Sequence, residues 1–513
     1  MIFDLAVSEK FDLTDTNERI VIVGTGPVGI YLAYCLLKAR QSVILIEAGA
    51  RIADSSRNSI ATRSVGREFV GHKLGRTFGL GGTSVVWGGQ LAEFDRADFE
   101  TWPLRFEDVY PLYAKVYADL AVAPESAETY RERLGGEVAD DLPIERFFTH
   151  WLPQQNFARI FKKKVIEDPD TTVLLNSTVS GITFEGDRAK SVTIRAASGH
   201  ETTISGRHFV FCNGTLEIIR FFLSTAKTSA VPWRNNCEIG KRYQDHPCGK
   251  VATAHILDEK KFRDFFENAI VAGAVKLYPK VRVREEAREK SDLGVVGFFA
   301  FRSDIQEHLG HIKWLIRAIR SGAQGTSLRS LPGDIRTLIS VFAPVTRRFV
   351  RDRRIMAFFD RSVDFMVQCE QRPSADSQVR LNDEHHRVPG LFGIDIDWRL
   401  DEEETIHALT KFTALADNYF QARGLARLAI DERVSASDPA FVASMYDVYH
   451  HAGGMCMADS PTTGVVESDC RVWGTANVFI GGAAVFPSSG HANTTLTALA
   501  LAARLAPMLA AKP

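Results

Sequence analysis

The sequence lacks an excess of charge of either sign, and its cysteines lack the spacing of a metal or redox site. Its 62 Lys and Arg residues nearly balance 63 Asp and Glu residues, giving a formal net charge of -1. Nucleic acid is not an expected partner, because a chain without a basic field does not attract a polyanion. The seven cysteines, at positions 35, 212, 237, 248, 369, 456 and 470, form no CxxC pair. Their odd number and scatter favour reduced thiols over a disulfide framework.

Two further absences concern membranes and metals. The first nineteen residues contain no continuous apolar stretch and include the acids Asp4, Glu9, Asp12, Asp15 and Glu18. We therefore expect neither a secretory signal nor an integral membrane segment, and we expect a cytoplasmic location. The histidines lack a paired cysteine or carboxylate at ligand spacing, so no metal site is expected.

A glycine-rich turn follows the first β-branched run. Residues 21–29 read VIVGTGPVG, and the next apolar run, 43–46, ends on Glu47. In a dinucleotide-binding unit Gly24 permits the tight bend, Gly26 lets the backbone approach a pyrophosphate, and Gly29 lets the following helix, 30–39, pack on the sheet. Glu47, eighteen residues after Gly29, lies near the spacing of a ribose-binding acid. This pattern predicts an ADP-containing cofactor, FAD or NAD, with Pro27 also at its binding turn.

A second glycine-rich segment spans residues 75–89 and places six glycines around Thr83 and Ser84. Such a run does not form a regular helix, and glycine is typical where backbone passes close to a ligand. The apolar insert Val85-Val86-Trp87 argues against a freely solvated surface loop. We interpret the segment as a loop that covers the cofactor.

The length of 513 residues exceeds the ~250 to 300 at which one core stops growing, so at least two domains are expected. Short strands at 172–175, 192–194 and 208–212 indicate that the nucleotide-binding sheet resumes there. Residues 251–445 differ: they carry helical patterns at 307–321 and 334–345 and strand patterns at 295–301, 365–369 and 394–398. We assign 1–100, 160–250 and 446–513 to a discontinuous FAD-binding domain, and 101–159 and 251–445 to a substrate-binding domain. The basic run 347–354 favours a solvated helix face, with a membrane-surface helix or a dock for an electron acceptor as alternatives.

The last seventy residues bring polar groups into small-residue surroundings. One stretch, 449–457, reads YHHAGGMCM, and another, 487–497, reads PSSGHANTTLT. A neutral imidazole accepts a hydroxyl proton near pH 7, while an amide or a second imidazole stabilises the developing alkoxide. Loss of that proton weakens the adjacent C–H bond, so a hydride can pass to a positioned cofactor atom. These residue types therefore favour alcohol oxidation.

Taken together, the motifs resemble those of the glucose-methanol-choline (GMC) flavoprotein oxidoreductases. The resemblance runs the length of the chain and includes the 24–29 turn with Glu47, the 79–89 loop, Trp102-Pro103, residues 110–113, 212–215, 239–240 and 245–247, and 450–493. It implies an α/β fold with a Rossmann-like FAD-binding domain and a substrate domain built on a mostly antiparallel sheet flanked by helices. It also makes FAD the expected cofactor. The glycines at 481 and 482 tilt the resemblance toward the pyranose- and glycoside-oxidising branch.

The resemblance also implies roles for individual residues. His450 corresponds to the catalytic histidine, with His451 as the alternative register, and Asn493 corresponds to the second histidine or asparagine of the family. Cofactor contacts are implied for Gly81, Gly82, Thr83, Ser84, Val179, Gly482, Ala483 and Thr494. Because Val86 stands where members with covalent flavin carry a histidine, non-covalent FAD is expected. The sequence departs from the family pattern at Gly454, Cys456 and Thr494.

The predicted function is FAD-dependent oxidation of a hydroxyl group on a small-molecule alcohol or carbohydrate, a sugar, glycoside or polyol, to a carbonyl. O2 or another electron acceptor completes the cycle, and the sequence assigns no oligomeric state. Two alternatives stay open: a nicotinamide-dependent dehydrogenase, and a non-catalytic flavin-binding protein. A purely structural role is the alternative for four residues: His246 as a hydrogen-bonded turn residue, His491 as a solvent-facing residue, Cys456 as a buried thiol and Asn493 as a helix cap.

Overall fold

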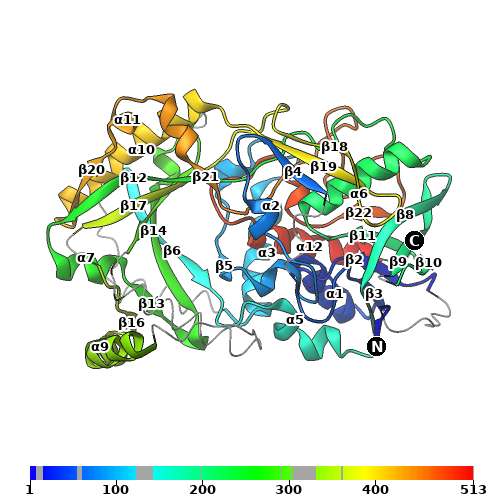
Figure 1. Cartoon of the computed structure of the whole chain (residues 1–513), viewed down its shortest axis with the longest axis horizontal. Coiled ribbons are helices and arrows are strands. Elements are labelled where there is room, and N and C mark those ends of the chain that lie inside the picture. The colour runs from blue at the N-terminus through cyan, green and yellow to red at the C-terminus, as the bar shows by residue number, and fades with distance from the viewer. Residues whose placement is uncertain are drawn as a thin grey trace.

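The structure is a computed structural model with two cores side by side along its long axis (Figure 1). It describes residues 1–6, 16–54, 61–122, 142–196, 198–289, 292–301, 303, 305, 331–359 and 362–511, without the side chains of 331–340 and 362. The helical pattern expected at 307–321 lies outside the described residues. In the described part, no helix is both long and apolar enough to span a bilayer.

The first core surrounds a six-stranded parallel sheet. Its strands, in spatial order, are β1 (Ile2–Asp4), β7 (Thr171–Leu175), β3 (Val43–Ile46), β2 (Ile20–Val23), β11 (His208–Phe211) and β22 (Val478–Ile480). β7, β3, β2 and β22 are buried along their whole length, which explains their continuous apolar sequences. Segments from the beginning, middle and end of the chain thus form one sheet, as the discontinuous fold predicts.

Helices from the same distant segments cover this sheet. They are α1 (Pro27–Lys38), α3 (Phe106–Asp119), α6 (Thr215–Thr228) and α12 (Thr494–Ala510). α12 contacts both α1 and α3, and the Tyr113 hydroxyl of α3 lies 2.9 Å from the Thr497 hydroxyl of α12. The α1 sequence is apolar on most sides because eight of its twelve residues are buried.

Two three-stranded sheets flank the parallel sheet. One consists of β8 (Ser177–Glu185), β9 (Arg188–Ala196) and β10 (Glu201–Ser205), and the other of β4 (Thr62–Gly66), β18 (Gln378–His385) and β19 (Phe392–Trp398). Ile394, Ile396 and Trp398 of β19, which lies within the 251–445 range, belong to the first core. α3, from the 101–159 range, packs in the first core as well.

The second core lies on one face of a ten-stranded, mainly antiparallel sheet. Seven strands follow in the order β16 (Arg354–Ile355), β13 (Asn268–Ile270), β14 (Lys276–Val283), β15 (Val295–Ala300), β17 (Ser362–Cys369), β12 (Pro247–Ile256) and β20 (Ala426–Ile430), and β5 (Gln90–Leu91), β6 (Ile144–Trp151) and β21 (Tyr446–Asp447) extend it. Phe299, Phe365 and Val367 are among the buried residues of this face. α10 (Glu402–Ala422) and α7 (Glu259–Phe266) cover it.

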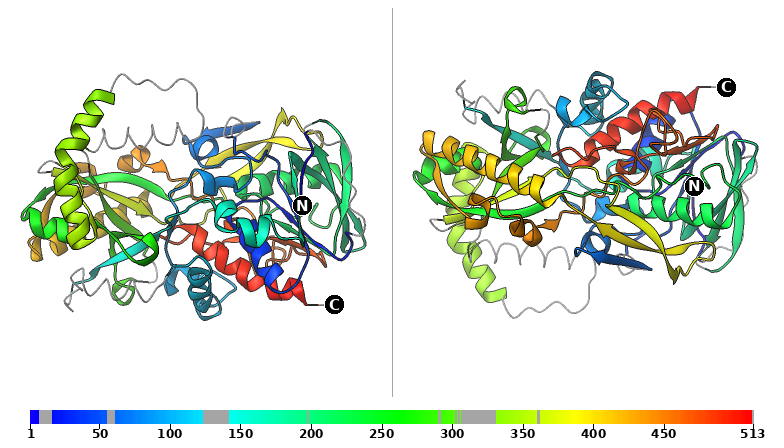
Figure 2. Two further views of the ribbon diagram at one scale, coloured as in Figure 1. Left: turned by 90° about the horizontal axis from the view of Figure 1, so that it is seen from below. Right: turned by 90° about the horizontal axis from the view of Figure 1, so that it is seen from above.

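The expected helix at 334–345 is part of α9 (Leu331–Asp352), which lies at the edge of the second core (Figure 2). Arg348, from the basic run, is not a solvated face residue: it bonds Asp264 at 2.7 Å and Glu267 at 2.8 Å. Phe342 and Val350 are exposed.

The remaining short elements are α2 (Gly71–Leu74), α5 (Phe157–Ile160), α11 (Glu432–Ser435), the 3-10 turns η1 (Gly82–Val85), η2 (Arg96–Phe99), η4 (Ala272–Ala274), η5 (Glu285–Ala287), η6 (Pro439–Ser444) and η7 (Ala483–Val485), and the π-helical turn η3 (Lys162–Ile166).

Candidate active site

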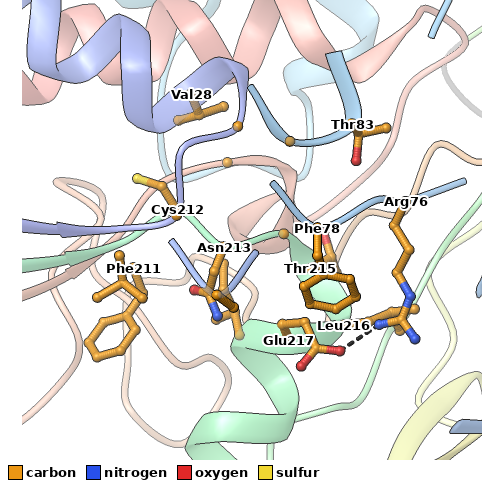
Figure 3. A pocket seen from close by; sticks show the side chains of 18 of the residues that line it. Val28, Arg76, Phe78, Thr83, Phe211, Cys212, Asn213, Thr215, Leu216 and Glu217 are labelled. Carbon is orange, nitrogen blue, oxygen red and sulfur yellow. Dashed lines mark hydrogen bonds and ion pairs between the residues drawn. The ribbon is translucent and has the colours of Figure 1, made fainter. Parts of the chain in front are cut away.

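A cavity of about 280 Å³ opens at the carboxyl ends of the parallel strands. Of the predicted cofactor-binding residues, Gly24, Gly26, Pro27, Glu47, Gly82, Thr83, Val179, Gly482, Ala483 and Thr494 line it, whereas Gly29, Gly81 and Ser84 lie behind its wall. Thr83 faces the cavity opposite Asn213 and Thr215 (Figure 3). The edge of the sheet where ligands bind in doubly wound folds is therefore hollow here.

Three long helices begin at this cavity without a side-chain cap. The N-cap residues are Gly26 for α1, Gly214 for α6 and Asn493 for α12, and none forms a capping hydrogen bond through a side chain. Uncapped N–H groups and the positive ends of helix dipoles attract negative charge. Their convergence on one cavity suits a diphosphate.

The glycines at the cavity divide into open and closed positions. A Cβ built on Gly26, Gly214 or Gly482 meets nothing within 4 Å, so these backbones border empty space. By contrast, a Cβ on Gly24 would lie 2.6 Å from the Cys212 carbonyl oxygen, and one on Gly29 would lie 2.1 Å from the Gly24 carbonyl oxygen. The fingerprint glycines thus serve both uses expected of them, tight packing and close approach of a ligand.

Glu47 stands at the end of β3, and both of its carboxylate oxygens accept hydrogen bonds. The Thr25 hydroxyl and backbone N–H donate to Oε2 at 2.6 and 3.1 Å, and the N–H groups of Gly49 and Gly79 donate to Oε1 at 2.9 and 3.0 Å. Burial raises the pKa of this carboxyl, and the four donors oppose that rise. Glu47 therefore joins the first glycine turn to the second glycine-rich loop, while a part of its surface still faces the cavity.

The loop 75–89 lies against the cavity over its first half. Gly75, Arg76, Thr77, Phe78, Gly82 and Thr83 line the hollow, which agrees with its interpretation as a covering loop. Ser84 is fully buried and does not point into the hollow: its hydroxyl donates to the Gly81 carbonyl at 2.5 Å and accepts from the Phe157 N–H at 3.1 Å. Ser84 shapes the loop from behind.

An ion pair on the cavity wall was not found from the sequence. Arg76 Nη1 lies 2.5 Å from Glu217 Oε1 (Figure 3). Glu217 also bonds Arg220 at 3.0 Å. Burial would raise the pKa of Glu217, but the two guanidinium groups lower it to about 2. No motif marks this pair, because its members lie 141 residues apart.

The catalytic candidates from distant stretches meet beside the cavity. His450 Nε2 lies 2.8 Å from Asn493 Nδ2, and His450 Nδ1 lies 2.8 Å from His246 Nδ1. Neither member of the first pair lines the cavity, but their chain neighbours Tyr449, His451 and Thr494 do. The structure thus brings together His450 and Asn493, as predicted, and adds His246.

Hydrogen bonding fixes the tautomers along this chain of side chains. His246 Nε2 lies 2.8 Å from the Gly490 carbonyl oxygen, which accepts only, so Nε2 carries the proton and Nδ1 accepts. His450 must then donate from Nδ1, which leaves the lone pair on Nε2, the atom that faces the Asn493 amide. Burial and the nearby positive charge of Lys280 hold the pKa of His450 well below its usual value. His450 is therefore a neutral imidazole whose Nε2 can accept a proton.

Asp245 holds the two histidines in place through the backbone. Its Oδ1 accepts from the N–H groups of His246 at 2.7 Å, His450 at 3.0 Å and Val448 at 3.3 Å. Asn493 occupies the N-cap position of α12, but its side chain makes no capping bond. Its Oδ1 is buried and has no hydrogen-bond partner among the described residues. An acceptor of that kind is open to a bound hydroxyl group.

His451, the alternative register, has other partners. Its Nδ1 lies 2.6 Å from the Tyr243 hydroxyl, and its ring packs near Phe69. Burial and the charge of Arg76 lower its pKa to about 3. His451 lines the cavity, but Asn493 contacts His450 and not His451.

The structural interpretations of Cys456, His491 and His246 differ in how they compare with the structure. Cys456 is a buried thiol, as expected. The expectation that His491 faces solvent is wrong, because the residue is 3% exposed. Asp98 pairs with it at 3.2 Å, and residues of the ten-stranded sheet lie next to it. Asp95, Asp98 and His491 lie close enough to share an ion. Arg288 already pairs with Asp98 at 3.1 Å. His246 is more than the hydrogen-bonded turn residue that the sequence suggests, because its Nδ1 contacts His450; the 245–247 motif is the one sequence signal that includes it.

Comparison with known proteins supports the same reading. Residues 373–502 match the family model described as GMC oxidoreductase. Among solved structures, the chain is similar to the crystal structure of pyridoxine 4-oxidase from Mesorbium loti, with a TM-score of 0.57 and 16% identity, over 96% of this chain and 99% of that chain. No curated protein matches the sequence. The resemblance to GMC oxidoreductases and the expected α/β fold are thus confirmed.

Proposed function

We propose that this chain, an oxidoreductase whose residues 373–502 carry the GMC family's C-terminal region, oxidises a hydroxyl group to a carbonyl with non-covalently bound FAD. The observation that carries the proposal is the hydrogen bond between His450 Nε2 and Asn493 at the N-terminus of α12, beside the cavity. The family match supports action on an alcohol group. A sugar, glycoside or polyol as substrate remains our prediction, as do the cytoplasmic location and the choice between O2 and another acceptor.

The residues around the cavity fit FAD. The uncapped starts of α1 and α6 and the open face of Gly26 would hold the diphosphate, Glu47 would meet the ribose, and Val179 would lie at the adenine. Gly482, Ala483 and Thr494 would lie along the ring system. Bound flavin supplies the hydride acceptor. With Val86 53% exposed and no histidine at that position, a non-covalent attachment is proposed.

The chain's own groups then divide the work. His450 Nε2 accepts the hydroxyl proton, because its tautomer and low pKa leave the lone pair available. The Asn493 amide N–H, now bonded to that same nitrogen, is placed to stabilise the developing negative charge on oxygen. His246 Nδ1 accepts a hydrogen bond from the Nδ1–H of His450. This bond keeps the proton on Nδ1 and leaves Nε2 as the basic atom. His451 supports the wall next to this group.

An anaerobic reduction experiment tests the proposal. The purified yellow protein is mixed with sugars, polyols and simple alcohols, and loss of the visible flavin band is followed before and after air is admitted. We expect at least one hydroxyl compound to bleach the flavin, and the His450→Gln variant to retain flavin but lose most of that rate. A colourless protein that needs a nicotinamide, or flavin that no hydroxyl compound reduces, would contradict the proposal.

A further inference from the structure

The ten-stranded sheet turns a second, polar face toward the catalytic histidines. Arg282 of β14 pairs in register with Val296 of β15, which in turn pairs with Gln368 of β17. Side chains two residues apart on a strand point the same way, so Tyr278, Lys280 and Arg282 share this face. Gln368 shows which residues this face contacts. Its amide donates to the His491 carbonyl at 3.0 Å and lies 3.3 Å from His246 Nδ1. Residues of this face therefore border the substrate side of the site.

Lys280 is the unusual member of this face. It is 6% exposed, and its ammonium group lies 5.2 Å from the ring centroid of Phe298. Its positive charge is close enough to His246 and His450 to lower the pKa of both imidazoles. Such a charge so near a catalytic base has a large influence on what the site accepts.

Other cations on the face have carboxylate partners. Lys250 Nζ lies 2.6 Å from Asp364, and Arg282 pairs with Asp95 at 2.6 Å and with Glu145 at 2.7 Å. Within the described ranges, no carboxylate pairs with Lys280, and the thiol of Cys248 is the group that most favours its charged form. Burial lowers the pKa of Lys280 to about 8. A buried ammonium without an anion is costly unless a ligand supplies one.

We propose that Lys280 binds an anionic group, a carboxylate or a phosphate, carried by the hydroxylated substrate whose alcohol lies at His450. This inference rests on the proposed function and narrows its substrate class from neutral alcohols to hydroxylated anions. The hydroxyl oxygen would meet His450 and Asn493, and the anionic group would lie toward β14, with Phe298 as an apolar wall. No covalent step is involved, because Lys280 acts as a cation that orients the substrate.

Anion binding tests the inference without requiring turnover. Propionate, methyl phosphate and the neutral isostere propionamide are titrated into the holoenzyme at pH 7, and binding is followed by calorimetry and by the flavin spectrum. We expect one of the two anions to bind at least tenfold more tightly than propionamide, and the two anions to separate a carboxylate site from a phosphate site. Binding should weaken as the pH rises above about 8, the pKa that burial gives Lys280 before an anion raises it.

Two variants sharpen this test. Lys280→Met keeps the length of the buried chain and removes the charge, so we expect it to lose the preference for anions while Lys280→Arg keeps a part of it. The matched control is Lys250→Met, which removes a cation from the same sheet face that already has Asp364 as its partner. That variant should bind the anions as the parent protein does. Kinetics with a hydroxylated anion and its methyl ester should show the same loss of preference in Lys280→Met only.

The outcomes distinguish this inference from the proposed function. If neutral alcohols reduce the flavin but neither anion binds, Lys280 does not hold an anion and the inference is wrong, while the proposed function stands. If Lys280→Met slows neutral and anionic substrates equally, the inference is also wrong. Anion binding that depends on Lys280, together with flavin that no hydroxyl compound reduces, would support the site and contradict the proposed function.

Discussion

Replacing His246 by leucine should reduce the rate of substrate oxidation without removing the flavin. In the parent protein His246 Nδ1 accepts a hydrogen bond from the Nδ1–H of His450 at 2.8 Å, which keeps the lone pair of His450 on Nε2. Leucine offers no acceptor, so the buried imidazole must leave its Nδ1 proton unpaired or move it to Nε2. The second choice removes the base that faces Asn493.

The size of the effect follows from that hydrogen bond. A buried donor left without a partner costs about 1 to 3 kcal/mol. At ~1.36 kcal/mol per factor of ten in rate, the rate constant for flavin reduction should fall roughly 5- to 150-fold. The pH profile should move as well, because neutral His246 accepts a hydrogen bond from His450 and so stabilises the protonated form of that imidazole. Without this acceptor the pKa of His450 falls further, so the acid side of the kcat/KM profile shifts to lower pH.

Anaerobic stopped-flow reduction from pH 5 to 9 measures both quantities. His72→Leu provides the control, because His72 is likewise buried and bonds a carbonyl, that of Phe69, but is not part of the His246–His450 chain. A merely destabilised protein would lose flavin and rate in both variants without a shift in the acid limb. The reasoning would be refuted if His246→Leu reduced flavin at the parent rate with an unchanged pH profile.

Two further predictions concern binding and stability. Gly26→Ala should fold but bind FAD more weakly, since its Cβ enters open space at the helix start, whereas Gly29→Ala should destabilise the whole domain through its clash 2.1 Å from the Gly24 carbonyl; flavin content and thermal melting separate the two. Arg220→Met should lower the free energy of unfolding by about 3 to 5 kcal/mol, because Arg220 is 1% exposed and bonded to Glu217. In urea titrations the exposed Arg380→Met variant should unfold close to the parent.

The nucleotide-binding half of the fold was predictable because its signals are local. The 21–29 turn, the buried strand before it and the acid at the end of β3 each depend on short-range geometry. Which core α3 and β19 belong to could not be predicted from such local signals. Both pack in the first core, and that depends on contacts between residues hundreds of positions apart, which periodicity does not encode.

The same contrast holds within the site. His450 and Asn493 could be proposed from their motifs, and the structure places them in contact. The buried His246 and Lys280 could not be selected, because a lone histidine or lysine in a sequence is more often structural or solvated. Their importance depends on β14 and β17 lying in one sheet whose polar face contacts His246 through Gln368. That arrangement becomes visible only when strand order and register are known.

The parallel sheet is completed by β22, which together with α12 follows the other strands and helices of this core along the chain. Strands β2 and β3 lie within residues 20–46, yet β11 gains its outer neighbour only when residues 478–480 have been synthesised. Assembly of this sheet therefore waits until the long stretch of chain between β3 and β22 has been made, which gives it a high contact order and a correspondingly slow final step. Loading of FAD is expected to be a post-translational event, and any truncation before residue 478 would leave an apolar strand edge exposed to aggregation.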